Sequence, residues 1–116
     1  MSDSPSIFTK IIAREIPADI VFESDSMIAF RDIAPQAPVH VLVVPKTEQF
    51  ANVTELAAGD PALLAELVSV AQSLADELAG GQYRLIFNTG ENAGQTVFHV
   101  HAHVLGGNLE EGTLGH

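Results

Sequence analysis

The sequence of 116 residues contains no cysteine at all. This absence excludes disulfide bonds, thiolate zinc sites and cysteine nucleophiles. Long apolar runs are also missing, since no stretch approaches the roughly 20 apolar residues that a membrane-spanning helix needs. The first residues carry neither the basic segment nor the apolar core of a secretion signal. We therefore expect a cytoplasmic protein that has no membrane partner.

Basic residues are scarce, because five Lys and Arg stand against 15 Asp and Glu and leave a formal charge of −10. Binding of DNA or RNA depends on basic side chains that neutralise phosphates, so we expect no nucleic-acid partner. A small phosphorylated ligand is still compatible with this charge. A pocket can offer local hydrogen-bond donors to such a ligand against the overall field.

The length predicts a single domain. Residues 1–6 are expected to form a disordered arm, residues 7–107 the folded domain, and residues 108–116 an extended tail. The predicted elements are a short helix at 7–14, strands at 20–23, 27–31 and 39–44, a long helix from the Asp60 cap to Gly80, and strands at 83–88 and 97–105. This order predicts an α+β fold, in which an antiparallel sheet of about five strands is covered on one face.

Three of the five histidines lie in the segment His99-Val100-His101-Ala102-His103. A spacing of two is the repeat of a β-strand, so the pattern predicts that all three imidazoles lie on one face. The residues between them are apolar and suit the opposite, buried face. A row of imidazoles indicates chemistry near neutral pH.

A metal site is the main alternative, because imidazole is a common zinc ligand. Residues on one face of a strand are about 6.6 Å apart, so His99 and His103 would be separated by roughly 13 Å. One zinc ion could take two neighbours but would need a ligand from elsewhere, for which His40 is the internal candidate. We therefore expect no metal and no cofactor. Catalysis by imidazole itself is favoured, and His101, with a histidine on either side, is the expected nucleophile.

The pattern of His, hydrophobic, His, hydrophobic, His and two hydrophobic residues at 99–105 resembles the histidine triad (HIT) family. Further segments are similar to its Hint-like branch of nucleotide-binding phosphoramidases. They lie in order over about residues 7–107 and comprise Ile7-Phe8, Ile11-Ile12, residues 15–18, Phe30, residues 32–40, residues 43–46, Asn88, Gly90, residues 94–96 and the triad. The resemblance implies a HIT-like fold with one long helix and a short N-terminal helix, and a homodimer.

The resemblance also implies a hydrolase of purine nucleoside phosphoramidates or related AMP or GMP derivatives, in which His101 forms a covalent nucleotidyl intermediate. It implies that His99 and His40 orient and polarise His101, and that His103 contacts the phosphate or the leaving group. The implied phosphate ligands are the side chains of Asn88 and Thr96 and the main-chain N–H groups around Gly94 and Gln95.

For the nucleoside, the resemblance implies that Asp32 binds the ribose hydroxyls. It implies an apolar base pocket made of Ile7, Phe8, Ile11, Ile16, Phe30 and Ile33. Apolar residues of these types are usually core, and Asp32 could equally be a turn residue. Two other functions stay open, namely dinucleoside polyphosphate hydrolysis and a nucleotide-binding regulatory module with incidental catalysis.

The chain departs from the family pattern at both ends. The segment Ser6 to Thr9 occupies the place where some bacterial relatives carry Cys-x-x-Cys, so we expect no structural zinc. The tail after Gly107 lacks the Trp-Pro-Pro-Gly ending of Hint-type members. Because that ending reaches the partner subunit's site in those members, the leaving-group preference stays open.

Overall fold

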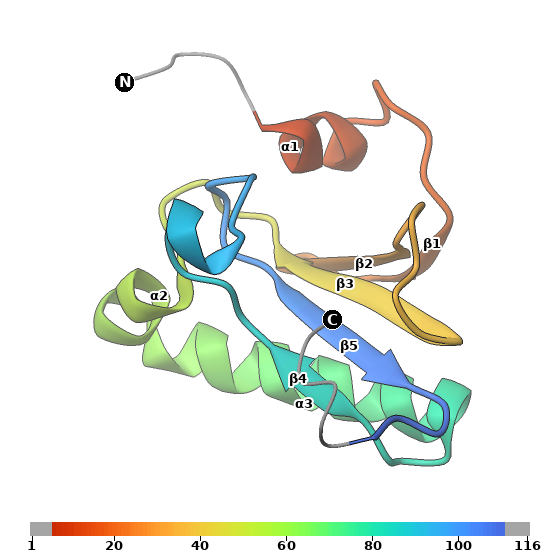
Figure 1. Ribbon diagram of the computed structural model, residues 1–116. Coiled ribbons are helices and arrows are strands. Elements are labelled where there is room, and N and C mark those ends of the chain that lie inside the picture. Colours follow the sequence, from red (N-terminus) through yellow and green to blue (C-terminus); the bar gives the residue numbers. More distant parts are fainter. Residues whose placement is uncertain (1–5, 111–116) are drawn as a thin grey trace.

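The computed structural model describes residues 6–110 and has an α+β fold with one five-stranded antiparallel sheet (Figure 1). The strand order is β1-β2-β3-β5-β4. The elements in chain order are α1 (Ile7–Ile12), β1 (Ile20–Glu23), β2 (Met27–Arg31), β3 (Val39–Pro45), α2 (Val53–Gly59), α3 (Pro61–Ala79), β4 (Arg84–Ile86), the 3₁₀ helix η1 (Glu91–Ala93) and β5 (Ala102–Gly106). The predicted fold class is confirmed.

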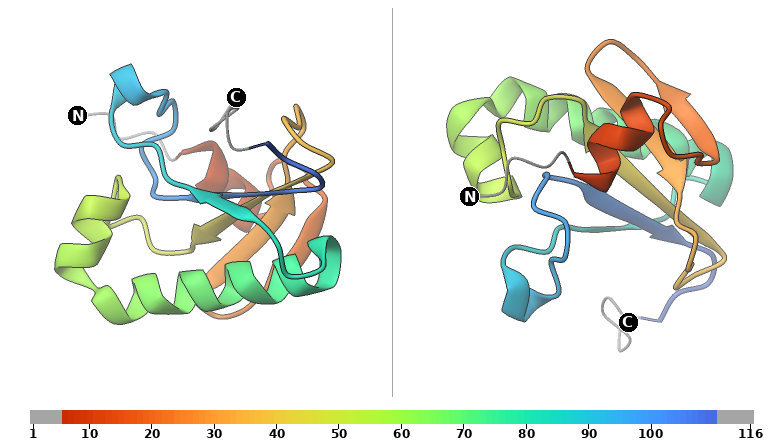
Figure 2. Two further views of the ribbon diagram at one scale, coloured as in Figure 1. Left: turned by 60° about the horizontal axis from the view of Figure 1, so that its bottom comes forward. Right: turned by 90° about the horizontal axis from the view of Figure 1, so that it is seen from above.

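The long helix α3 covers one face of the sheet, as Figure 2 shows. Its ends are those that the sequence predicts. The Asp60 carboxylate accepts the Leu63 N–H at 3.0 Å, Pro61 occupies the first turn, and Gly80 ends the helix with a φ of 63°. The side of α3 that faces the sheet packs on the inward-facing strand residues Met27, Ala29, Val41, Val43, Ala102 and Val104.

The opposite face of the sheet is covered by α1, whereas the sequence predicted cover on one face only. Alternate residues of the central strands are apolar on this side as well, so the strands need a second cover. The buried cluster under α1 consists of Phe8, Ile11, Ile28, Phe30, Leu42 and Val44. Helix α1 ends two residues before the predicted boundary, because Arg14 adopts a left-handed backbone with a φ of 63°.

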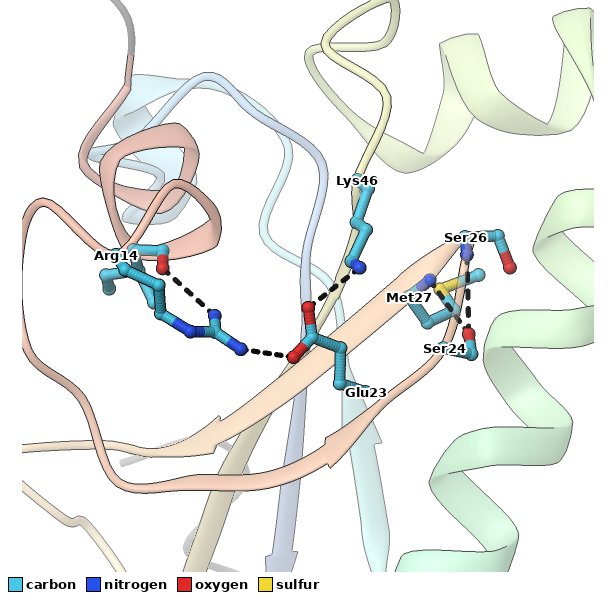
Figure 3. Close-up of polar contacts among 7 residues, drawn as sticks. Arg14, Glu23, Ser24, Ser26, Met27 and Lys46 are labelled. Atoms are coloured by element: carbon cyan, nitrogen blue, oxygen red, sulfur yellow. Dashed lines mark hydrogen bonds and ion pairs between the residues drawn. The ribbon is translucent and has the colours of Figure 1, made fainter.

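Ion pairs at Glu23 fasten the end of α1 to the sheet, as Figure 3 shows. The Glu23 carboxylate lies at the end of β1, where it accepts from the Arg14 guanidinium and pairs with the Lys46 ammonium at 2.8 Å. Hydrogen bonds from Lys46 and then Arg14 lower the pKa of Glu23. A side chain after α1 and one after β3 are therefore held on a single carboxylate.

Helix α2 was not predicted. The Asn52 side chain accepts the Glu55 N–H at 2.9 Å, and the Glu55 carboxylate accepts the Ala51 N–H at 2.9 Å. This reciprocal pair is close to a capping box, so the signal was present in Asn52-Val53-Thr54-Glu55. The helix is short and buries only Leu56, which leaves little apolar periodicity to detect.

Strand β5 begins at Ala102, so the prediction of a strand over 97–105 is wrong in its first half. Its pairing with β3 starts at Val43 and Ala102. Two residues further, the ladder would place Pro45 opposite Val100. Because proline has no N–H to donate, the pairing stops there. The first two histidines of the triad therefore precede the strand.

Strand β4 is also shorter than the predicted 83–88, since it is an edge strand whose pairing ends at Ile86 and His103. Ser6, predicted as the last residue of a disordered arm, caps α1, while residues 1–5 lie outside the described residues. Residues 107–110 form neither helix nor strand, and the rest of the predicted tail is outside the description. Within residues 6–110, no helix combines the length and apolarity needed to cross a membrane.

Candidate active site

Four histidines gather where β3 and β5 lie side by side. His40 is two residues from Leu42 on β3, and His103 on β5 pairs directly with Leu42, so both lie on the face that α1 covers. The His103 ring centroid lies 5.2 Å from that of His40 and 5.2 Å from that of His101. His99 and His101 come from the segment just before β5. The sheet therefore adds His40, remote in sequence, to the triad.

His101 has its ring nitrogens assigned by the main chain. Its Nδ1 lies 2.8 Å from the carbonyl oxygen of His99. A carbonyl can only accept, so Nδ1 carries the proton and Nε2 keeps its lone pair. The Phe8 ring packs edge-on at a centroid distance of 4.8 Å. Burial lowers the pKa of His101 and outweighs the hydrogen bond to the His99 carbonyl, which raises it, so the neutral ring with a nucleophilic Nε2 is favoured.

His40 and His103 form a second pair with a defined proton arrangement. The Gln36 N–H donates to His40 Nδ1 at 3.0 Å, so the proton of a neutral His40 is on Nε2. His40 Nε2–H donates to His103 Nδ1 at 2.9 Å, which leaves a proton on His103 Nε2. Burial, His101 and His40 together lower the pKa of His103 to about 4. Burial also lowers the pKa of His40, against an opposing effect of Asp32.

The structure shows how His99 and His40 are placed relative to His101. The His99 ring is directed at the Pro45 carbonyl, to which its Nε2 donates at 2.7 Å, and His99 contacts the His101 ring through its own carbonyl. His40 contacts His103 and not His101. The expected roles came from the resemblance, which names residues but not the atoms that they use. The spacing argument assumed a regular strand through His99, His101 and His103, whereas β5 begins only at Ala102.

Asp32 joins the histidine pair and completes a set of possible metal ligands. Ligand atoms of Asp32, His40 and His103 all lie within 4.8 Å of one another. A metal would need the lone pair of His40 Nε2, but the Gln36 N–H that faces Nδ1 keeps the proton on Nε2. If the proton moved to His40 Nδ1, that N–H would face the Gln36 N–H, and two donors would be opposed. The hydrogen bonds therefore favour a proton-carrying cluster over a metal site.

Asp32 itself is already partly engaged, since its Oδ1 accepts the Ala34 N–H at 2.8 Å and its Oδ2 lies 3.5 Å from His40 Nε2. The first contact is an Asx-type turn, which the sequence analysis left open beside a ribose-binding role. The second contact was not predicted. Asp32 stands just after β2, and only the pairing of β2, β3 and β5 brings it to the histidines.

The predicted phosphate loop is organised differently from the expectation. The N–H groups of Gly94 and Gln95 donate to the carbonyls of Glu91 and Gly90 at 3.0 and 3.1 Å. In this conformation they close a turn and are not directed at a ligand. Asn88, which is half-buried, and the exposed Thr96 still offer side-chain donors.

The Gln95 side chain is a buried support for this loop, with 4% exposure. Its Oε1 accepts the Gly90 N–H at 2.9 Å, and its Nε2 donates to the carbonyls of Ala51 and Val97 at 2.6 and 3.0 Å. The amide thus ties the loop before the triad to the segment after β3. The sequence analysis assigned the Gln95 main chain to phosphate binding, and the supporting role of the side chain was not predicted.

Substituting Gln95 with leucine is expected to lower the free energy of unfolding by about 2–3 kcal/mol, because it leaves buried N–H and C=O groups without partners. Urea unfolding followed by circular dichroism measures this loss. Asn92→Ala, at an exposed position of the same loop, is the matched control and should leave the unfolding midpoint unchanged. Equal midpoints for both variants would contradict a supporting role for the amide.

The predicted base-pocket residues separate into two groups. Phe8, Ile11 and Phe30 are at most 6% exposed in the cluster under α1, and Ile16 is half-buried against it. Their packing accounts for their apolar character. The remaining two, Ile7 at 47% and Ile33 at 98% exposure, present apolar surface that a base could contact.

The fold and the site define a class: an α+β protein with a cluster of four histidines beside a central strand. The family model of the HIT domain matches residues 13–109. A purine nucleoside phosphoramidase of Escherichia coli is 45% identical over 104 residues, covering 88% of this chain and 87% of that protein. An uncharacterized HIT-like protein of Synechococcus elongatus is 54% identical over 104 residues, covering 88% and 90%.

Among solved structures, a HIT family hydrolase from Clostridium thermocellum superposes with a TM-score of 0.84 at 45% identity, covering 91% of this chain and 93% of that one. The chain belongs to the HIT family. The predicted family is therefore confirmed by sequence and by structure.

Proposed function

We propose that the protein hydrolyses purine nucleoside phosphoramidates, or closely related AMP or GMP derivatives, through a covalent nucleotidyl intermediate on His101. One observation carries the proposal: the main-chain carbonyl of His99 holds the proton on His101 Nδ1 and leaves Nε2 as an unprotonated nucleophile. The likeness to a relative named purine nucleoside phosphoramidase supports the substrate class.

In the proposed first step, His101 Nε2 attacks the α-phosphorus, and a phosphorus–nitrogen bond to the ring forms as the bond to the leaving amine breaks. The departing nitrogen takes up a proton from solvent and leaves as the amine, while the Nε2–H of neutral His103 donates a hydrogen bond to the phosphate or to the leaving group. Water then cleaves the nucleotidyl-histidine, which releases the nucleoside monophosphate and restores the Nε2 lone pair. In this route the negatively charged substrate meets the neutral rings of His101 and His103 and the side-chain donors of Asn88 and Thr96, so no cofactor is needed.

Trapping the intermediate tests this proposal. The protein is mixed with adenosine 5′-phosphoramidate, quenched at mildly alkaline pH to preserve the phosphorus–nitrogen bond, digested and analysed by mass spectrometry. An adenylyl group is expected on the peptide that contains His101. Turnover with no adduct at His101 in rapid-quench samples would refute the covalent route. Diadenosine polyphosphate in a parallel assay distinguishes the two enzyme functions, because the better substrate has the higher kcat/KM.

The pH dependence of the reaction follows from the lowered pKa values. Because folding lowers the pKa of His101 below its usual 6.5 and brings that of His103 to about 4, both rings stay neutral to lower pH than solvated histidines do. We expect kcat/KM to be constant between about pH 8 and pH 7 and to fall in acid with a midpoint below about 6.5. Initial rates across this range measure the profile.

Circular dichroism at each pH is the control for that profile. The unfolded chain takes up protons at higher pH than the folded one, so the free energy of unfolding also decreases as the pH falls from about 6.5 towards about 4. Half-maximal activity at about pH 6.5 or above, in protein that remains folded, would mean that the rings titrate as solvated histidines and would contradict the expected profile.

We further propose a cytoplasmic homodimer whose folded domain spans residues 7–107 and whose tail follows it. Within the described residues, β4 pairs with β5 alone and has an open edge, and α3 exposes 39% of Val68. Both features suit a two-fold contact through strand and helix. Light scattering coupled to size-exclusion chromatography determines the mass in solution, and a monomer at micromolar concentration would contradict the proposal.

A further inference from the structure

Ser6 makes a contact that none of the roles above uses. Its hydroxyl Oγ lies 3.0 Å from His99 Nδ1, although the two residues are at opposite ends of the described chain. The same Oγ accepts the Thr9 N–H at 3.1 Å as the N-cap of α1. One oxygen therefore joins the start of α1 to the first histidine of the triad.

The direction of each hydrogen bond follows from its fixed partners. His99 Nε2 faces the Pro45 carbonyl, which only accepts, so Nε2 carries the proton of the neutral ring. His99 Nδ1 must then accept, and the Ser6 hydroxyl is the donor that faces it. The oxygen of Ser6 keeps its lone pairs for the Thr9 N–H and the Thr9 hydroxyl, which lies 3.3 Å away. Every polar atom of this link has a compatible partner.

The consequence for the nucleophile comes through the main chain of His99. Its ring is 3% exposed and is held at both nitrogens, while its carbonyl accepts the proton of His101 Nδ1. Two hydrogen bonds to the buried ring restrain the side chain and Cα of His99, and they thereby support the placement of the carbonyl that follows. Phe8, also from α1, packs on the His101 ring from the same helix.

We propose that Ser6 is a positioning residue for His101, whose hydroxyl holds the His99 ring and thereby the carbonyl that keeps the nucleophile in its reactive tautomer. The proposal deepens the proposed hydrolysis and rests on it for its kinetic consequence. The hydrogen bond from Ser6 to His99 Nδ1 does not depend on the proposed hydrolysis and can be tested separately.

Three variants separate positioning from helix capping. Ser6→Ala removes the cap and the donor, Ser6→Asp keeps a capping oxygen but has no proton to donate at neutral pH, and Ser6→Thr keeps both. We expect Ser6→Ala and Ser6→Asp to lower kcat about three- to tenfold with little change in KM, as for the loss of one hydrogen bond. Ser6→Thr should restore kcat, and Thr9→Val, which keeps its main-chain N–H, should retain it.

Two readouts make the outcome decisive. The thermal midpoint should fall for Ser6→Ala but not for Ser6→Asp. A loss of kcat in both variants therefore indicates that Ser6 positions His99. A wild-type kcat in Ser6→Asp would show that Ser6 only caps α1 and would overturn the proposal. Nitrogen-15 NMR of the rings needs no substrate. We expect the His99 Nδ1 resonance to shift in Ser6→Ala relative to wild type. An unchanged resonance would show that the hydrogen bond from Ser6 to His99 is absent and would overturn the proposal. A shifted resonance in a protein that does not turn over the substrate would support the hydrogen bond and refute only the hydrolytic function.

Discussion

His101→Ala is expected to reduce hydrolysis of adenosine 5′-phosphoramidate by about 10⁴-fold or more, the loss typical when a covalent nucleophile is removed. The reason is that no neighbouring ring can take over. Among the described histidines of the cluster, His99 has both nitrogens engaged by Pro45 and Ser6, and His103 has its Nδ1 occupied by His40. Only His101 combines an unprotonated Nε2 with a partner that holds its other nitrogen.

Steady-state kinetics and a binding measurement together check this result. AMP should still bind to His101→Ala in calorimetry, and the thermal midpoint should stay close to that of the parent protein. Phe98→Ala is a suitable control, because Phe98 lies in the same segment with 57% of its surface exposed. Turnover within about tenfold of the parent in a folded His101→Ala protein would remove His101 as nucleophile.

The second large effect concerns the pair of His40 and His103. His103→Phe removes the Nε2 hydrogen-bond donor and is expected to lower kcat by about 10²-fold, the loss typical when one donor to the charge that develops in the transition state is removed. His40→Phe leaves His103 without the hydrogen bond that sets its tautomer, so its loss should be nearly as large. The double variant should be no slower than His103→Phe, since His40 contacts the reaction only through its neighbour.

A double-mutant cycle on kcat measures this coupling, with thermal midpoints to show that all three variants are folded. Non-additivity is the expected result, because both changes interrupt one chain of hydrogen bonds from the Gln36 N–H to His103. Additive losses would instead give His40 a separate role, such as its own contact with the substrate. In that case the proton arrangement inferred for the pair is wrong.

The sequence predicted the fold well where one local signal sufficed. The cap at Asp60 and the stop at Gly80 placed α3 correctly, because both act within one turn of the helix. It failed where a neighbouring strand decides the outcome. The alternation around the histidines indicated a strand over 97–105, but the residue that ends the pairing is Pro45 on another strand. A proline fifty or more positions away cannot be detected from periodicity.

The site shows the same division. The residue types around the triad predicted the family, which the comparisons confirm, while the nucleophilic role of His101 stays a prediction. The contacts of these residues required the sheet. Pairing of β2, β3 and β5 brings Asp32 beside His40, and helix α1 brings Ser6 to His99. Gln95 shows a further difficulty, because a buried amide that bonds three main-chain groups has the same sequence signature as one that binds a ligand.

Three of the partners that hold the imidazoles are main-chain groups: the carbonyls of His99 and Pro45 and the amide of Gln36. Such groups are common to nearly all residue types, so side-chain replacements at Gln36 would leave its contribution in place. In an alignment that position could vary freely and still serve the chemistry. The tautomers of these rings thus depend partly on the conformation of the main chain. A search for invariant side chains would not detect these main-chain contacts.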